Sequence, residues 1–457
     1  MNNHSNKYIL NKKSATAYNK TRSLFKRRFI CFAPYKTMRF SVSGIVHTCC
    51  YNRYLKLGTY PEQNLHNIWF GEQNKLLQKN ISNHDFSQGC QTCHEFISAN
   101  NFYGAGCKNY DYLPKSRNSF PVMLEFEASN ICNLACIMCN GDNSSYFRKE
   151  REKKEPYTVP YDDDFVTQLK EFIPFLYEAR FVGGEPFLTP LYYKIWEEIL
   201  KINPRVKISV LTNATILNEQ IKQLLNEGNF NISVSIDSFT KETYESIRIN
   251  SDFNNVMKNF DYFYSYSIQN KKWFNINICP IKNNMFEIPS IVDFCNKKEI
   301  NIFFHTVYAP ANCSLWSMSS SELKSLIDFT KQYRPNSDTK TKAENANIFY
   351  AYLKQLESWY EKAIIRESKN IVQNHFMSSK KIILEKLSVF LLASGKDENY
   401  TKSILYKADS IIEKIKKENI SNNAMHFLMN TPENKIIAEI ENFSEEKLVE
   451  KLKQICV

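Results

Sequence analysis

The middle of the chain alternates between two kinds of apolar pattern. Short runs rich in β-branched and aromatic residues, typical of buried strands, are separated by stretches with the apolar spacing of amphipathic helices. The predicted strands are 121–128, 179–183, 207–213, 231–237, 274–281 and 300–307. The predicted helices between them are 162–176, 191–202, 218–228, 253–267 and 288–298. This alternation predicts a parallel α/β sheet or barrel, in which active sites lie on the loops after the carboxyl ends of the strands.

The patterns differ on both sides of this region. Before it, short apolar runs alternate with turn residues and cysteines, and after it come Lys- and Glu-rich helical patterns, the first opened by a capping box at Ser319 and Glu322. The C-terminal helices either form a small helical domain, cover the open end of the barrel or hold a substrate peptide. We expect four parts: a basic, flexible lead-in (1–28), a cysteine-rich domain (29–115), the α/β region (116–315) and a helical C-terminal region (316–457).

Composition and charge narrow the function classes. The 457 residues are 43% hydrophobic and 23% charged, ordinary values for a globular protein of two or three domains. The sequence contains neither a membrane-spanning apolar run nor a secretory signal, so we expect a cytoplasmic protein without a membrane partner. The net charge is +11, and residues 7–39 hold ten Lys or Arg and no Asp or Glu. A solvated lead-in is favoured there over an arm for nucleic acid or anionic lipid.

The first predicted strand leads into a loop with three clustered cysteines. Cys132, Cys136 and Cys139 follow the spacing C-x₃-C-x₂-C. In a reducing compartment, clustered cysteines indicate metal binding or catalysis. A structural zinc site takes four ligands, and no further Cys or His follows nearby to complete one. A [4Fe–4S] cluster has four irons, so three thiolates leave one iron open to another ligand. A buried structural trio is the alternative.

This loop resembles the cluster loop of the radical S-adenosylmethionine (SAM) superfamily. That family often has an aromatic residue just before the third cysteine. This chain has Met138 at that place, and we expect Met138 to lie beside SAM. The resemblance implies a partial (β/α)₆ TIM-like barrel whose open iron chelates SAM. It also implies reductive cleavage of SAM to a 5′-deoxyadenosyl radical, which abstracts hydrogen from a substrate. An external electron donor such as a flavodoxin or ferredoxin is then expected.

A second motif of that superfamily follows the second predicted strand. FVGGEPFL resembles its GGEP-type motif, in which Gly183 and Gly184 would let backbone approach the ligand closely. Glu185 would accept a hydrogen bond from the SAM ammonium. An ordinary strand-to-loop turn is the alternative.

Four further positions add to the resemblance. Asn213 of LTNAT occupies the place of a pocket residue after the third strand. Ser235 and Asp237 of the fourth strand are two residues apart and therefore share a face. The resemblance implies that this face is turned toward the SAM ribose and carboxylate. Arg248 is expected to pair with the SAM carboxylate, and a solvated helix position is its alternative.

A second cysteine pattern precedes the α/β region. Cys31, Gly44 and Cys49 fit the C-x₉₋₁₅-G-x₄-C signature of the SPASM/twitch auxiliary-cluster module, and Cys90 and Cys93 follow as a pair. The resemblance implies one auxiliary [4Fe–4S] cluster, held by these four cysteines, for electron transfer or substrate binding. In the family this module usually follows the core, whereas here it precedes the core.

Other readings of the remaining cysteines stay open. Cys50 could replace Cys49, Cys107 could be a spare ligand, and a zinc ribbon would also use two separated cysteine pairs. The scattered cysteines Cys279, Cys295, Cys313 and Cys456 are expected to be buried apolar residues, and His305 to satisfy a backbone partner.

Two classes of function remain. The favoured one is an oxidoreductase-like radical SAM enzyme that acts on an unidentified substrate, preferably a peptide. The alternative within this class is a radical SAM dehydrogenase or epimerase of a small carbohydrate-like molecule. The other is a non-catalytic zinc-binding protein that interacts with nucleic acid. It explains the charge and the front cysteines but not the open coordination at the three-cysteine loop, so nucleic acid is not favoured as a partner.

Overall fold

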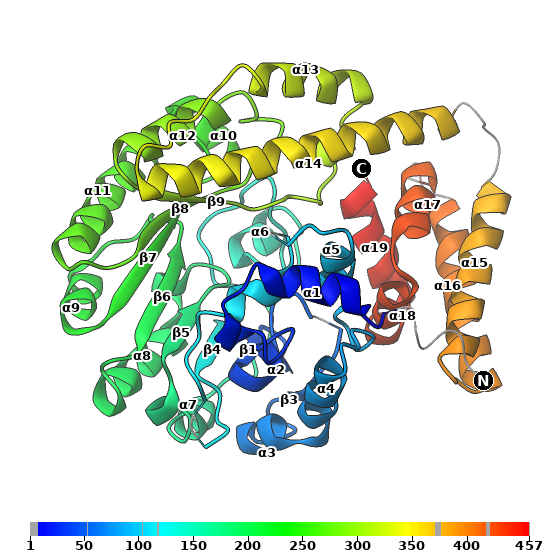
Figure 1. The fold of residues 1–457 in the computed structure, drawn as a ribbon, viewed down its shortest axis with the longest axis horizontal. Coiled ribbons are helices and arrows are strands. Elements are labelled where there is room, and N and C mark those ends of the chain that lie inside the picture. Colours follow the sequence, from blue (N-terminus) through cyan, green and yellow to red (C-terminus); the bar gives the residue numbers. More distant parts are fainter. Residues whose placement is uncertain are drawn as a thin grey trace.

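The centre of the molecule is one nine-stranded sheet. The computed structural model describes residues 8–456 except 53, 103, 117, 371–375 and 417–420. The sheet has the order β3-β2-β1-β4-β5-β6-β7-β8-β9 (Figure 1). The six predicted strands are present as consecutive parallel strands of this sheet: β4 (Met123–Glu127), β5 (Glu178–Phe181), β6 (Lys207–Thr212), β7 (Phe230–Ser235), β8 (Phe274–Ile278) and β9 (Asn301–Phe304). Because β3 and β9 are edges among the described strands, the sheet is an open, partial barrel, as predicted.

Helices cover the outer face of this sheet (Figure 1). The predicted five are present as α7 (Asp163–Leu169), α8 (Pro190–Ile202), α9 (Glu219–Glu227), α11 (Phe253–Gln269) and α12 (Ile288–Lys297). In β6, Ile208, Val210 and Thr212 are buried, whereas Ser209 and Leu211, at the alternate positions, are half-buried. This alternation places apolar side chains under the helices and leaves a more polar inner face.

The cysteine-rich segment is built into the same sheet. It contains α2 (Ala33–Lys36), β1 (Thr37–Ser41), β2 (Ile45–His47), β3 (Gly58–Thr59), α3 (Leu65–Phe70), α4 (Glu72–Ser82) and α5 (Gln91–Ser98). Strand β1 pairs in parallel with β4 along its whole length, and Phe40 stacks on Phe126 with ring centroids 5.2 Å apart. The segment therefore shares one apolar core with the barrel.

The expected flexible lead-in contains a packed helix. Helix α1 (Lys12–Lys20) buries Tyr18 completely, and the Arg22 guanidinium makes two hydrogen bonds of 2.6 Å to Asp111. The sequence could not reveal this, because the acidic partner of Arg22 lies 89 residues further along the chain.

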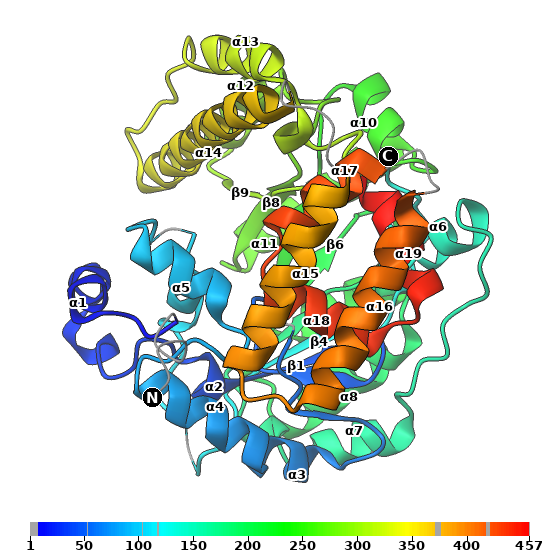
Figure 2. The ribbon, with the colours of Figure 1, turned by 90° about the vertical axis from the view of Figure 1, so that its right-hand side faces the viewer.

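The C-terminal helices divide into two groups. Helices α13 (Ser320–Thr330) and α14 (Lys340–Asn370) pack against the barrel, and the expected capping box at Ser319 and Glu322 is present. The other five form a bundle with an apolar core of its own, here called the C-terminal bundle: α15 (Phe376–Ala393), α16 (Glu398–Lys416), α17 (Ser421–Asn430), α18 (Glu433–Asn442) and α19 (Glu445–Cys456). Figure 2 shows the bundle in front of the sheet.

Polar contacts attach the bundle to the rest of the molecule. Lys154, just after α6 (Ser145–Glu150), pairs with Glu450 at 2.9 Å, and Lys56 donates to Asn442 at 2.8 Å. The remaining short elements are 3₁₀ turns and one helix: η1 (Leu24–Lys26), η2 (Gly106–Tyr110), η3 (Ile173–Phe175), η4 (Pro186–Leu188), η5 (Leu315–Ser317) and α10 (Lys241–Ile247). Among the helices that the structure describes, none has the combination of length and apolar character that a membrane crossing requires.

Candidate functional site

The three-cysteine loop lies at the carboxyl end of β4, on the rim where active sites of such folds lie. Cys132, Cys136 and Cys139 are all half-buried. The loop between them is held by backbone hydrogen bonds of Ala135 and Ile137 to the end of α10 and the residues after it, at 3.0 and 2.9 Å. The position of the thiols is therefore fixed by main-chain contacts and not by the thiols themselves.

Without a metal, burial favours the protonated form of these thiols. Burial raises the pKa of Cys136 to about 11 and that of Cys139 to about 12, and burial also raises the pKa of Cys132. Metal binding would have to displace these protons. Among the described residues, no three His, Cys, Asp or Glu side chains converge as ligands of one metal ion. A [4Fe–4S] cluster makes a different demand, because each thiolate binds its own iron.

The GGEP turn packs directly against this loop. Gly183 and Gly184 have φ of +83° and +56°, conformations that favour glycine. A Cβ on Gly184 would lie 2.2 Å from the carbonyl oxygen of Ile131, the residue before Cys132. The glycines, expected to let backbone approach a ligand, thus let the turn approach the cysteine loop.

The Glu185 carboxylate is used within the fold. It is fully buried and accepts hydrogen bonds from the Thr212 hydroxyl at 2.8 Å and from the backbone N–H groups of Asn213 and Phe187 at 2.6 and 3.1 Å. Burial raises the pKa of Glu185 to about 7. Its side chain, expected toward the SAM ammonium, joins the GGEP turn to the loop after β6.

That second loop carries Asn213, which lies beside the thiols. Its amide nitrogen is 3.8 Å from Cys132 Sγ and donates to Asn133 Oδ1 at 3.1 Å. The structure therefore brings together the cysteine loop, the GGEP turn and the TN motif, three segments that are far apart in the sequence.

Asp237 and Arg248 form a buried ion pair. Arg248 Nη2 lies 2.8 Å from Asp237 Oδ2, and their side chains are 7% and 0% exposed. Asp237 also accepts from the N–H of Cys279 at 2.7 Å. Burial alone would lower the pKa of Arg248, but the Asp237 carboxylate together with Cys136, Tyr244 and Cys279 more than offsets it, so that pKa is raised. Asp237, expected to face a ligand, is thus directed to Arg248.

Arg248 also acts on one of the clustered thiols, and the two remaining predicted residues lie nearby in the fold or in a separate apolar cluster. The positive charge of Arg248 acts on Cys136, whose pKa it lowers against the larger effect of burial. Arg248 Nε is buried and has no hydrogen-bond partner among the described residues. Ser235 is half-buried at the end of β7, and Met138 packs in a small apolar cluster with Ile247.

The front cysteines converge on one small cavity. Its lining includes Cys31, Cys49, Cys90, Cys93 and Cys107. Two neutral donors point to these thiols: the Asn52 amide lies 3.3 Å from Cys90 Sγ, and the Ala33 N–H 3.4 Å from Cys31 Sγ. The module therefore collects the four predicted ligands and adds Cys107.

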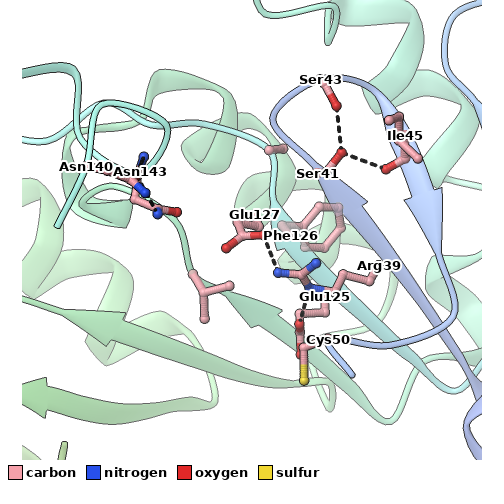
Figure 3. Close-up of polar contacts among 12 residues, drawn as sticks. Arg39, Ser41, Ser43, Ile45, Cys50, Glu125, Phe126, Glu127, Asn140 and Asn143 are labelled. Atoms are coloured by element: carbon pink, nitrogen blue, oxygen red, sulfur yellow. Dashed lines mark hydrogen bonds and ion pairs between the residues drawn. The ribbon is translucent and has the colours of Figure 1, made fainter. Parts of the chain in front are cut away.

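Cys50 lies apart from this group. Its sulfur is 3.9 Å from the Tyr110 hydroxyl and lies near Arg39 and Glu125 (Figure 3), and Cys50 is not among the residues that line the small cavity. Between the two adjacent cysteines, the arrangement thus favours Cys49. Of the scattered cysteines, Cys295, Cys313 and Cys456 are buried as expected, whereas Cys279 is half-buried.

Charged residues on the inner face of the sheet were not predicted. Arg39 of β1 lies between Glu125 and Glu127 of β4, donating to Glu125 at 2.7 Å and also to Glu127 (Figure 3). On β5, Arg180 donates to Glu178 at 2.7 Å. A signal was present, because charged residues at alternate positions of otherwise apolar strands indicate a polar inner face.

A large cavity of about 1750 Å³ opens beside the cysteine loop. On the barrel side it is lined by Glu127, Ser129 and Cys139, and on the other side by residues of α14 and the C-terminal bundle. One of the three clustered thiols thus lies at the wall of a space that extends into the bundle.

Comparison with known proteins agrees with this arrangement. Residues 126–295 match the radical SAM superfamily, and residues 31–94 match the SPASM iron–sulfur cluster-binding domain. GTP 3′,8-cyclase of Clostridium botulinum is 26% identical over 170 residues, which cover 37% of this chain and 49% of that protein. GTP 3′,8-cyclase of Limosilactobacillus fermentum is 26% identical over 206 residues, covering 44% and 59%. The chain spans about half the length of the curated relatives it matches.

Solved structures are similar at a lower level. Native anSMEcpe with bound AdoMet is 22% identical, with 46% of this chain and 60% of that chain covered and a TM-score of 0.36. Streptococcus suis SuiB bound to S-adenosylmethionine is 18% identical, with 58% and 59% covered and a TM-score of 0.33. This chain therefore contains a radical SAM domain at residues 126–295, with an iron–sulfur cluster-binding domain ahead of it at residues 31–94.

Proposed function

We propose that this protein is an enzyme that cleaves SAM reductively and abstracts hydrogen from a peptide. The observation that carries the proposal is the set of three half-buried thiols, Cys132, Cys136 and Cys139, fixed at the rim of a barrel that opens on a large cavity. A protein that only stores zinc would not need this access.

The residues present fit a [4Fe–4S] cluster and SAM. Three thiols leave one iron without a protein ligand, and Arg248 Nε is a buried N–H that lacks a partner in the described part of the chain. When bound, such a cluster would supply the electron for reductive cleavage of SAM, from which hydrogen abstraction would start. The three cysteines would hold the cluster, while Gly183, Gly184, Asn213, Ser235 and Arg248 would surround SAM.

The residues of the chain position and shield this chemistry. Arg248 is held by Asp237 and offers a cation to a ligand carboxylate, a pairing that burial strengthens. Glu185 fixes the loop that carries Asn213, so this amide stays beside Cys132. The helices on the outer face of the sheet keep water from that side.

The cysteine-rich segment would hold an auxiliary [4Fe–4S] cluster. Cys31, Cys49, Cys90 and Cys93 supply four thiolates from one cavity wall, which is the number that a complete cluster needs. Such a cluster can take up the electron that a net oxidation or a cross-link releases, or it can bind substrate. An external flavodoxin or ferredoxin in the cytoplasm would provide the electron for SAM.

The size of the cavity supports a peptide substrate. Small-molecule sites usually have volumes of about 300–1,000 Å³, and this cavity has about 1750 Å³. It therefore has room for a chain segment as well as SAM. A small carbohydrate-like alcohol, oxidised or epimerised at one carbon, is the second candidate, favoured by the hydroxyl and carboxylate groups of Ser129 and Glu127 at the barrel end.

The test is an anaerobic assay of 5′-deoxyadenosine. The reconstituted protein would be reduced with dithionite, given SAM, and compared with a variant in which Cys132, Cys136 and Cys139 are all Ala. We expect cleavage by the wild type alone, and about four irons per chain left in the variant from the auxiliary cluster. Zinc in place of iron, or cleavage that survives the triple substitution, would contradict the proposal.

A further inference from the structure

The C-terminal bundle forms one wall of the large cavity. Its residues reach the cavity from α15, α16, α17, α18 and α19, and the bundle lies outside both matched domains. Core residues such as Leu387 and Ile412 line the cavity as well, so the space enters the bundle between its helices. This wall is available for a ligand that also reaches Cys139.

The charges of the two walls have opposite signs. On the barrel side the charged lining residues are Glu127, Asp142, Glu152 and Arg151. On the side of α14 and the bundle the acidic lining residues are Glu439 and Glu450, whereas the basic ones are Lys362, Arg366, Lys386, Lys435, Lys451 and Lys453. A ligand on the helical wall therefore meets mainly positive charge.

Both acidic groups of the helical wall already have cationic partners. Glu439 pairs with Lys451 at 2.8 Å, and Glu450 pairs with Lys154 at 2.9 Å. They therefore do not neutralise the other cations of this wall.

Three of the cations are held by neutral groups. Arg366 donates to the backbone carbonyls of Trp316 and Met318, and Lys386 donates to the carbonyl of Met429. Lys435 lies 3.4 Å from the Thr92 hydroxyl and 5.5 Å from the centre of the Tyr54 ring. The partners at hydrogen-bond distance of these three cations are thus neutral groups among the described residues, and the Glu95 carboxylate acts on Lys435 only from a longer distance. Burial lowers the pKa of Lys435, and the Glu95 carboxylate offsets this effect only in part.

We propose that the C-terminal bundle binds the substrate and selects an acidic peptide segment, through Arg366, Lys386 and Lys435. The inference rests on the proposed function, because it assigns the substrate of that site. Apolar side chains of the segment would enter between the helices, and its carboxylates would lie against the three cations. Carboxamides at the cavity wall, from Asn312, Asn430 and Gln454, suit the polar groups of a peptide backbone.

The experiment measures peptide binding directly. Two fluorescent peptides of about twelve residues would share the same apolar residues and differ by Glu or Lys at four positions. Their affinities for the full-length, SAM-loaded protein would be determined by fluorescence anisotropy at low and high salt. We expect the acidic peptide to bind at least tenfold more tightly, with a preference that falls as salt rises.

Two matched sets of substitutions test whether the preference for the acidic peptide comes from the cavity wall. The combination Arg366→Gln, Lys386→Gln and Lys435→Gln removes three charges from the cavity wall. Lys381→Gln, Lys402→Gln and Lys407→Gln removes three charges from exposed positions of α15 and α16 outside it. We expect the first set to weaken binding of the acidic peptide about tenfold and the second less than twofold, with unchanged far-ultraviolet circular dichroism.

Other outcomes would overturn the inference. Equal affinity for the two peptides, or equal effects of the two variant sets, would show that this wall does not select acidic segments. An unlabelled single-stranded oligonucleotide that displaces the peptide at lower concentration would indicate a nucleic-acid ligand instead. If the wild-type protein binds the acidic peptide but forms no 5′-deoxyadenosine, the proposed function is refuted and the binding inference stands.

Discussion

The Asp237–Arg248 pair gives the sharpest test of how the site is held together. Replacing Asp237 with Asn removes the negative charge but keeps an oxygen that can accept from the Cys279 N–H, now at 2.7 Å. The new amide group would face the Arg248 guanidinium, donor against donor. The substitution therefore leaves a buried cation without compensation while the backbone contact persists.

The magnitude follows from the geometry. Two unit charges 2.8 Å apart attract by about 6 kcal/mol at an effective dielectric constant of about 20. Breaking such a buried pair by removing one partner typically costs about 3–5 kcal/mol. We expect Asp237→Asn to lower the free energy of unfolding by about 4 kcal/mol, and Asp237→Asn with Arg248→Met to lower it less than the single substitution does.

Urea denaturation followed by circular dichroism measures both variants. The matched control is Asp163→Asn, which breaks the exposed pair of Asp163 with Lys194, whose side chains are 82% and 55% exposed. We expect this control to change stability by less than about 1 kcal/mol. If Asp237→Asn is as mild as the control, Arg248 is not held by this pair and the reasoning about its orientation fails.

Three further predictions concern the neighbouring groups. Gly184→Ala should reduce the iron bound at the three-cysteine loop, because its Cβ would lie 2.2 Å from the Ile131 carbonyl oxygen. The control is Gly395→Ala, whose Cβ would have no atom within 4 Å. Equal iron in the two variants would contradict the packing argument. Glu185 has a pKa near 7 when folded and near 4.5 when unfolded, so wild-type stability should fall by about 3 kcal/mol between pH 4.5 and 7.5 relative to Glu185→Gln in urea titrations. Parallel pH curves would contradict it. Cys49→Ala should lose auxiliary iron and its electron paramagnetic resonance signal, whereas Cys50→Ala should keep both, because Cys49 but not Cys50 lines the small cavity.

Most of the barrel was predictable because its signals are local. Each of the six strands is a compact apolar run, and each predicted helix has its own apolar stripe, so neither depends on a distant partner. The course of the first 120 residues was not predictable in the same way. The pairing of β1 with β4, like the ion pair of Arg22 with Asp111, joins residues more than 80 positions apart.

In the site, too, local features were predictable from the sequence and contacts between distant segments were not. The thiols follow from their spacing, but the direction of a carboxylate does not follow from its place in a motif. Glu185 and Asp237 were expected to face a ligand, and the structure directs them to Thr212 and Arg248. Burial explains the difference, since a fully enclosed carboxylate needs internal donors or a cation, and neighbouring loops supply them. The large cavity could not be predicted, because the bundle that closes it folds around a separate core.

The parallel pairing of β1 with β4 ties the cysteine-rich segment to the barrel by a continuous ladder of backbone hydrogen bonds. A domain on a linker can vary its separation from the catalytic loop, but a segment that shares a sheet cannot. The span between the two cysteine groups is therefore set by strand geometry, and electron tunnelling between them would have one fixed path length. The same ladder makes the segment indispensable. Deleting the residues before 120 would remove β1 and leave β4 as an unpaired sheet edge, which promotes aggregation.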